Sequence, residues 1–312
     1  QGPMLILAGA GTGKTRTITY RVAHMIDHGV SPRHILAVTF TNKAAREMQQ
    51  RAAKLMPNPP TRDNEKPLKP TICTFHSLCV RILRRHIEKL GYKRNFVIYN
   101  ESEQLGVVKK ILSTISGKDV KADPRELHSL LSRLKNAGPK GNVFGDEDTL
   151  AMADHIRKRY DTALKAANAV DFDDLLVLTL KLFNENPEAL EECRARYQYV
   201  MVDEYQDTNA TQFELMRMLA TDHRNVCVVG DDDQSIYGWR GAEISNLLDL
   251  EKYFPDLKVI KLEQNYRSTR VILEAANAVI KNTPRRRSKQ LWTARGQGEL
   301  IRLHAFGNEE EE

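Results

Sequence analysis

A glycine-rich stretch near the start of the sequence constrains the fold more than any other feature. Residues 5–15 read Leu-Ile-Leu-Ala-Gly-Ala-Gly-Thr-Gly-Lys-Thr, an apolar run followed by three alternating glycines and then by helix-forming sequence. A short apolar run is typical of a buried parallel strand, and a glycine-rich turn from strand to helix directs backbone N–H groups toward phosphate. The stretch therefore predicts an α/β fold of the P-loop NTPase kind with a parallel sheet. A glycine-rich turn that binds no nucleotide is the alternative interpretation.

This loop contains the groups that bind the phosphates of a nucleotide and their magnesium ion. Lys14 would reach the outer phosphates, and the hydroxyl of Thr15 would bind Mg²⁺. Ala8 stands where the usual motif begins with glycine, so the pattern reads A-x4-G-K-T and keeps every phosphate-contacting group. The residues predicted to line the phosphate site are Ala8, Gly9, Ala10, Gly11, Thr12, Gly13, Lys14 and Thr15.

Further apolar runs typical of buried strands lie on both sides of a block with helical periodicity. Strands are predicted at residues 34–40, 71–75, 197–202, 226–229 and 257–262. Helices and no strand are predicted between residues 86 and 185, at 101–115, 125–136, 148–169 and 173–182, with a breaker at 138–141. We therefore expect one parallel-sheet domain, at 1–85 and 186–265, interrupted by an inserted all-helical subdomain at 86–185.

Composition excludes several classes of protein. Hydrophobic residues make up 41% of the 312-residue chain and charged residues 28%, as in globular proteins. No apolar run approaches the roughly 20 residues that span a bilayer, and no signal peptide opens the sequence, so we expect a cytoplasmic protein without a membrane partner. The four cysteines lack C-x-x-C spacing and are expected to be reduced core residues, and the nine histidines lack metal-ligand spacing. The net charge of +6 permits a polyanionic partner. The charge runs at 285–287 and 309–312 are expected to be solvated.

A pair of acidic residues follows the strand predicted at 197–202, where parallel sheets place their ligands. Asp203 is predicted to hold the magnesium ion that bridges the outer phosphates. Glu204 is predicted to orient or deprotonate the attacking water. Capping of the next helix is the alternative role for such a pair.

The strand predicted at 226–229 is followed by a loop, residues 230–242, that combines polar and aromatic side chains. Gln234 could contact the terminal phosphate. Tyr237 and Trp239 are two residues apart and precede Arg240, an arrangement suited to stacking on unpaired bases. Two rings buried in the core are the alternative, although neighbouring glycines favour a loop.

At this point the sequence resembles the superfamily 1A DNA helicases of the Rep, UvrD and PcrA type. The resemblance rests on seven ordered motifs that span nearly the whole chain. They are Ala8–Arg16, Thr39–Met48, Thr74–Ser77, Asp171–Leu175, Asp203–Asn209, Gly230–Ala242 and Leu262–Ser268. It implies a RecA-like domain 1A interrupted by a helical domain 1B, with the start of a truncated domain 2A at 266–312.

The resemblance also implies roles for individual residues, with ATP and Mg²⁺ as cofactors. Arg16 would lie near the nucleotide, Gln234 would sense the γ-phosphate, Tyr266 would stack on adenine and Arg267 would act as an arginine finger. Single-stranded DNA would contact Phe40, His76, Phe172, Tyr237 and Trp239. Burial in the core is the rival role for Phe40 and Phe172, and a strand-end cap is the rival role for His76.

The resemblance implies an ATP-dependent helicase that moves 3′ to 5′ on single-stranded DNA. Its partners would be single-stranded DNA, junctions of single-stranded and duplex DNA, and repair or replication proteins. We expect the chain to be an N-terminal fragment that binds single-stranded DNA weakly, hydrolyses ATP poorly and does not unwind duplex. Two alternatives stay open: a P-loop ATPase of another class, such as a kinase, and a non-catalytic nucleic-acid binding module. The aromatic loop counts against the first, and Lys14, Asp203 and Glu204 count against the second.

Overall fold

A computed structural model describes residues 2–56, 68–115, 123–136, 147–284 and 286–305. At its centre is a six-stranded sheet in the order β3-β2-β6-β7-β1-β8, and every neighbouring pair of strands is parallel. Its strands are β1 (Met4–Ala8), β2 (Ile35–Thr39), β3 (Thr71–Thr74), β6 (Tyr199–Val202), β7 (Val226–Gly230) and β8 (Lys258–Leu262). The predicted α/β class and each strand predicted from an apolar run are confirmed.

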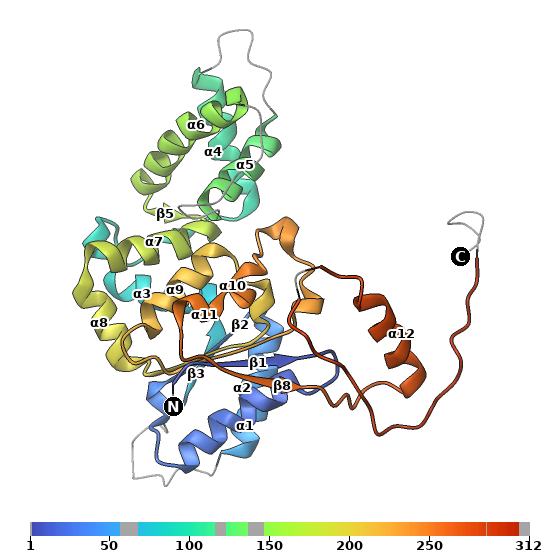
Figure 1. The fold of residues 1–312 in the computed structure, drawn as a ribbon. Coiled ribbons are helices and arrows are strands. Elements are labelled where there is room, and N and C mark those ends of the chain that lie inside the picture. Colours follow the sequence, from blue (N-terminus) through green and yellow to red (C-terminus); the bar gives the residue numbers. More distant parts are fainter. Residues whose placement is uncertain (1, 57–67, 116–122, 137–146, 285, 306–312) are drawn as a thin grey trace.

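Helices cover both faces of the sheet, and for this reason its central strands β2 and β7 are buried along their whole length (Figure 1). On one face lie α1 (Lys14–Asp27) and α2 (Asn42–Leu55), whose buried side chains pack against alternate strand residues such as Ile6 and Ala37. The other face is covered by α3 (Phe75–His86), α7 (Phe172–Glu185), α8 (Pro187–Arg196), α9 (Ala210–Ala220), α10 (Ser245–Leu248) and α11 (Leu250–Tyr253). Short 3₁₀ turns are η1 (Pro32–His34), η2 (Ile87–Leu90), η3 (Tyr205–Asp207), η4 (Asp232–Gln234) and η5 (Gly238–Arg240).

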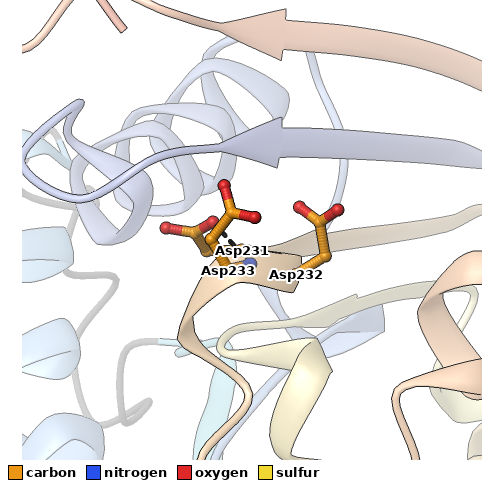
Figure 2. Close-up of side chains that lie close together, drawn as sticks. All are labelled: Asp231, Asp232 and Asp233. Atoms are coloured by element: carbon orange, nitrogen blue, oxygen red, sulfur yellow. Dashed lines mark hydrogen bonds between the residues drawn. The ribbon is translucent and has the colours of Figure 1, made fainter. Parts of the chain in front are cut away.

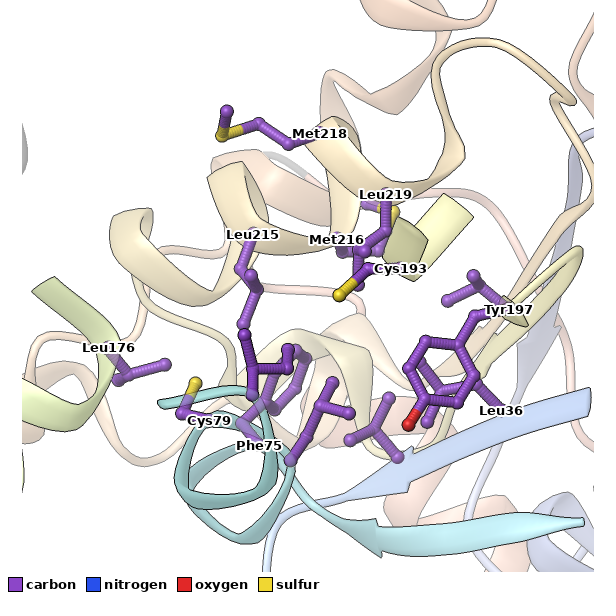
Figure 3. Close-up of a cluster of buried hydrophobic side chains, with 14 of the residues drawn as sticks. Leu36, Phe75, Cys79, Leu176, Cys193, Tyr197, Leu215, Met216, Met218 and Leu219 are labelled. Carbon is purple, nitrogen blue, oxygen red and sulfur yellow. The ribbon is translucent and has the colours of Figure 1, made fainter. Parts of the chain in front are cut away.

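The larger apolar core lies under this second face. Figure 3 shows side chains of α3, α8 and α9, among them Phe75, Cys193 and Leu215, in one cluster with Leu36 of β2. All four cysteines are buried and none forms a disulfide, as predicted. Burial raises the pKa of the Cys79 thiol to about 12, so this thiol stays protonated and behaves as a small apolar group.

The inserted block has an apolar core of its own. Its helices are α4 (Glu101–Ile115), α5 (Pro124–Asn136) and α6 (Glu147–Ala166), close to the predicted ranges, and they stand apart from the sheet (Figure 1). The prediction that no strand lies in this block is wrong, because β4 (Val97–Ile98) pairs in parallel with β5 (Ala169–Val170). Strands of two residues are too short to give a periodic pattern. The breaker predicted at 138–141 lies outside the described residues.

Helix α7 packs with the sheet domain although its sequence lies inside the predicted insertion. Its buried side chains, including Leu175, Leu182 and Phe183, belong to the same cluster as α3 and β2. The separate core of the block runs from Tyr99 to Ala169. We therefore propose that the inserted unit comprises residues 99–169 and that α7 belongs to the sheet domain, with 266–312 starting the next domain.

After β8 the chain leaves the sheet and forms α12 (Arg270–Ile280), which stands beside the sheet domain (Figure 1). The residues after α12 then run back toward the sheet. Arg286 and Arg287 form ion pairs with Asp233 and Glu251, so the expectation of a solvated charge run is wrong for these two. Residues 285 and 309–312 lie outside the described ranges. None of the helices in those ranges has the length and hydropathy that a bilayer-spanning segment needs.

Candidate nucleotide site and aromatic surface

The glycine-rich loop connects β1 directly to α1 at the carboxyl edge of the sheet. Gly11 and Gly13 have φ values of 71° and 92°, in the left-handed region that favours glycine. The hydroxyl of Thr12 donates to the carbonyl of Gly9 at 2.8 Å and closes the turn. Lys14 and Thr15 are therefore the first two residues of α1, at the helix end whose unpaired N–H groups favour anions.

Thr15 and Asp203 form the part of the site suited to a magnesium ion. The hydroxyl of Thr15 donates to Oδ2 of Asp203 at 3.1 Å, and the N–H of Asp203 donates to the carbonyl of Val38 at 2.9 Å. Burial, followed by the neighbouring Glu204 carboxylate, raises the pKa of Asp203 to about 6. A hydroxyl and a carboxylate are hard oxygen donors of the kind Mg²⁺ prefers, and its charge would favour the ionised form of Asp203.

Lys14 lies between two carboxylates without forming a close contact to either. Its Nζ is 3.4 Å from Oε2 of Glu204 and 3.9 Å from Oδ2 of Asp231. Both separations exceed the 2.7–3.2 Å typical of an N–H···O hydrogen bond. The Lys14 side chain is 10% exposed, so its ammonium group is largely shielded from water. In the part of the chain that the structure describes, it has no carboxylate at hydrogen-bond distance.

Gln206 links the loop after β6 to the loop after β7. Its Nε2 donates to Oε2 of Glu204 at 2.9 Å, and its Oε1 accepts the N–H of Asp231 at 2.9 Å. Glu204 itself has φ 49° and ψ 48°, a left-handed conformation that is uncommon for a non-glycine residue. Residues in such strained conformations are often found in active sites. Sequence reasoning assigned Gln206 no role, although it lies within the acidic motif.

The side chain of Gln234 also reaches Asp231, because its Nε2 donates to the same Oδ2 that faces Lys14. Asp231, Asp232 and Asp233 follow β7 directly and lie close together (Figure 2). The structure therefore brings Lys14, Thr15, Asp203, Glu204 and Gln234 together from the ends of β1, β6 and β7.

The segment after β8 lies against the phosphate loop. The N–H of Tyr266 donates to the carbonyl of Gly11 at 2.9 Å, and Nδ2 of Asn265 donates to the carbonyl of Ala10 at 2.7 Å. Oδ1 of Asn265 accepts the N–H of Arg267 at 2.8 Å, so this buried side chain shapes the turn. Sequence reasoning missed Asn265, although an Asn that bonds the backbone two residues on is a known turn signal.

The side chains of Tyr266 and Arg267 are exposed beside the loop. Arg16 is exposed in the first turn of α1, where its guanidinium carbon is 5.2 Å from the centroid of the Tyr20 ring. All three predicted nucleotide contacts therefore lie at the surface of the site.

Aromatic side chains gather at the same edge of the sheet. The rings of Phe40, after β2, and Tyr237, after β7, are stacked with centroids 5.5 Å apart, and the Trp239 ring lies 6.5 Å from Tyr237. Trp239 is 73% exposed, so the core alternative is wrong for it, whereas Phe40 is half-buried.

A second aromatic pair lies at the ends of β3 and β5. The His76 and Phe172 rings are stacked with centroids 3.8 Å apart, and Phe172 is 53% exposed, which excludes the core alternative for it. Burial lowers the pKa of His76 to about 4, so this ring is neutral near pH 7 and stacks as an uncharged aromatic group. The cap of α3 is Thr74, whose hydroxyl accepts the N–H of Ser77, so His76 is not that cap.

Comparison with known proteins adds a family to this geometry. A family model for the UvrD/REP helicase N-terminal domain matches residues 1–255, and a model for the UvrD-like helicase C-terminal domain matches residues 260–312. The ATP-dependent DNA helicase PcrA of Staphylococcus aureus strain Mu50 is 46% identical over 316 residues. The protein of the same name from Staphylococcus epidermidis is 45% identical over 320 residues. Each match covers 100% of this chain and 42% of the relative, so the chain spans less than half the length of these relatives.

Proposed function

This chain belongs to the UvrD/REP helicase family, and we propose on that premise that it forms the ATP-binding part of an ATP-dependent DNA helicase. One observation carries the proposal. Groups from the ends of three strands, Lys14 and Thr15, Asp203 and Glu204, and Gln234, meet around one helix N-terminus. Such a constellation suits phosphoryl transfer from a nucleotide to water.

In this proposal each group has a defined task. The backbone N–H groups of residues 9–13 surround the phosphates, and Lys14 moves from its carboxylate neighbours to the outer phosphates. Thr15 and Asp203 would hold Mg²⁺, which would neutralise phosphate charge. Glu204 orients the attacking water and accepts its proton, while the water oxygen bonds the γ-phosphorus and the bond from this phosphorus to the ADP oxygen breaks.

Four exposed or partly exposed side chains complete the proposed nucleotide contacts. Gln234 contacts the γ-phosphate and reports its presence to the loop after β7. Tyr266 stacks on the adenine, and Arg267 and Arg16 place positive charge beside the phosphates. The attachment of residues 265–267 to the phosphate loop supports this arrangement.

Single-stranded DNA is the proposed partner of the aromatic surface. Phe40, Tyr237 and Trp239 offer one set of rings for bases, and His76 and Phe172 offer a second. Stacking on such rings tolerates any base, which suits movement along a strand. We propose movement from 3′ to 5′ and action at junctions of single-stranded and duplex DNA, in repair or replication.

The 312 residues alone are proposed to hydrolyse ATP slowly and not to unwind duplex, because the relatives are more than twice as long. Robust unwinding by this chain would refute that part of the proposal.

ATP turnover with and without single-stranded DNA tests the proposal in the protein as its gene encodes it. We expect DNA to stimulate the wild type and Lys14→Ala to abolish the stimulated turnover. Lys54→Ala, which removes an exposed lysine of α2, is the matched control and should behave as wild type. A wild type whose turnover does not respond to DNA would overturn the helicase proposal.

A further inference from the structure

Three consecutive carboxylates after β7 surround a lysine from a distant part of the sequence. Asp231, Asp232 and Asp233 present oxygens that all lie within 4.8 Å of one another, a spacing that could hold a metal ion (Figure 2). Nζ of Lys289 occupies this position. It lies 2.8 Å from Oδ1 of Asp231 and 2.7 Å from Oδ2 of Asp233, and it also bonds Asp232.

Lys289 is held there as a permanent internal cation. Its side chain is 1% exposed, so water contributes almost nothing to its solvation. Burial alone would lower the pKa of Lys289, but the carboxylates of Asp231, Asp232 and Asp233 reverse that effect and raise it. The ammonium group therefore stays charged, with each of its three protons directed at a carboxylate.

The residues around Lys289 connect the loop after β7 to the phosphate loop. We call residues 286–291 the strap. Arg286 donates to Oδ2 of Asp233 at 2.9 Å, and the N–H of Arg287 donates to Oδ2 of Asp232 at 2.6 Å. At the other end of the strap, Leu291 fills the space where a Cβ on Gly9 would lie, within 2.3 Å of that position.

Asp231 is the junction between Lys289 and the nucleotide site. Its Oδ1 bonds Lys289, while its Oδ2 accepts from Nε2 of Gln234 and lies 3.9 Å from Nζ of Lys14. Oδ1 also accepts the N–H of Asp233 at 3.2 Å, so Lys289 and this backbone group together orient the Asp231 carboxylate. The direction of the Gln234 amide therefore depends in part on Lys289.

We propose that Lys289 is a positioning residue of the nucleotide site, which acts through Asp231 to hold Gln234 toward the γ-phosphate. The inference rests on the proposed ATP hydrolysis. Without Lys289, the Asp231 carboxylate would lose its nearest cation, and Gln234 would lose its fixed acceptor.

A double-mutant cycle on ATP turnover tests this coupling in the protein as its gene encodes it. The four proteins are the wild type, Lys289→Met, Gln234→Ala and the double variant. We expect Lys289→Met to lower kcat about tenfold and to change the KM for ATP less than about threefold, because binding groups stay in place. In the Gln234→Ala background, we expect the same substitution to lower kcat less than about twofold, because its effect passes through Gln234.

Lys281→Met removes an exposed lysine at the end of α12 and should leave kcat unchanged. Circular dichroism checks the fold of each variant. If Lys289→Met does not fold, Lys289→Arg keeps the charge and replaces it in the cycle, with the same expectation of a smaller effect in the Gln234→Ala background.

The results distinguish a failure of the proposed function from a failure of the positioning role. A wild type without DNA-stimulated turnover would refute the proposed function. An active wild type in which the effects of the Lys289 and Gln234 substitutions multiply would refute the positioning role and leave Lys289 a purely structural residue.

Discussion

Two lysines face the two oxygens of the same carboxylate, Asp231, and differ in how far their charge is satisfied. Nζ of Lys289 has close partners at 2.8 and 2.7 Å, and the side chain is 1% exposed. Nζ of Lys14 has its nearest carboxylates at 3.4 and 3.9 Å, and the side chain is 10% exposed. The ammonium group of Lys289 is fully paired with carboxylates of the chain, whereas that of Lys14 lies near two carboxylates without close contact.

The difference separates a structural charge from a functional one. A buried ammonium group is costly unless carboxylates satisfy it fully, and once satisfied it gains nothing from a ligand. A loosely held ammonium group at a helix N-terminus gains most of its contacts when a phosphate arrives. The same contrast separates Asp232, which is paired with Lys289, from Asp203, which has no close cation among the described residues.

The largest expected effect is on stability. Lys289→Met should lower the free energy of unfolding by about 3–5 kcal/mol, because it leaves the buried carboxylates of Asp231 and Asp232 and the partly buried one of Asp233 without their shared cation. Lys14→Met should change it by less than about 1 kcal/mol, since its ion pairs are long. Urea unfolding of the two variants without nucleotide measures both values, and equal losses would contradict the comparison.

The next largest effect is on turnover, where Lys14→Met should be more damaging than Lys289→Met. Lys14→Met should lower DNA-stimulated kcat by about 10²–10³-fold, the range seen when one donor to a developing charge is removed. Lys289→Met should lower it only about tenfold, because it acts through Asp231. Steady-state turnover of the two variants, with Lys54→Met as control, measures both effects. A larger loss of kcat in Lys289→Met than in Lys14→Met would contradict the comparison.

The sequence alone was sufficient to predict the parallel sheet, since its strands are continuous apolar runs bounded by glycine or polar residues. It also predicted Lys14, Thr15, Asp203 and Glu204 as neighbours. The glycine-rich loop before Lys14 and the acidic pair each follow a strand, and parallel strands end at one edge. These predictions needed only local pattern and one rule of topology.

The structure was needed for contacts between distant segments. Nothing in the segment Arg286–Lys289 marks it as the partner of the acids after β7, because a charge run has the same pattern whether solvated or paired. Gln206 was missed for a similar reason, since an amide side chain gives no sign of which carboxylate it will bond. The helical periodicity of α7 resembles that of the inserted helices before it, yet α7 packs with α3 of the sheet domain.

The comparison of a fully paired with a loosely held charge applies also to two carboxylates, Asp232 and Asp203. Burial raises the pKa of Asp203 to about 6 from its usual value near 3.8, so its stabilising contribution is present below about pH 3.8 and is lost as pH rises through 6. Asp203→Asn should therefore raise the free energy of unfolding at pH 8 by up to about 3 kcal/mol, and this gain should shrink as pH falls toward 5.

Asp232→Asn is the matched change in a saturated carboxylate and should lower stability at pH 8, because Lys289 loses a partner. Urea unfolding of both variants across pH, without magnesium or nucleotide, measures the two signs. Stabilisation by both substitutions would show that Asp232 is no better satisfied than Asp203.

The aromatic surface gives the smallest expected effect. Trp239→Ala should weaken binding of single-stranded DNA by about 1–3 kcal/mol, the contribution of one base stacked on one ring. Trp292→Ala removes the other tryptophan, which is 52% exposed beside the strap, and should leave DNA binding unchanged. Fluorescence anisotropy with a labelled oligonucleotide measures both, and equal losses would remove Trp239 from the DNA path.

Calorimetric titration of ATP and Mg²⁺ into the wild type, Lys14→Met and Lys289→Met tests most directly whether the loosely held lysine is the one that binds nucleotide. At a temperature where all three are folded, Lys14→Met should bind ATP at least about tenfold more weakly, a loss of about 1.4 kcal/mol or more, and Lys289→Met should stay within about threefold of the wild type. Wild-type affinity in Lys14→Met, or an equal loss in both variants, would contradict the distinction between the two lysines.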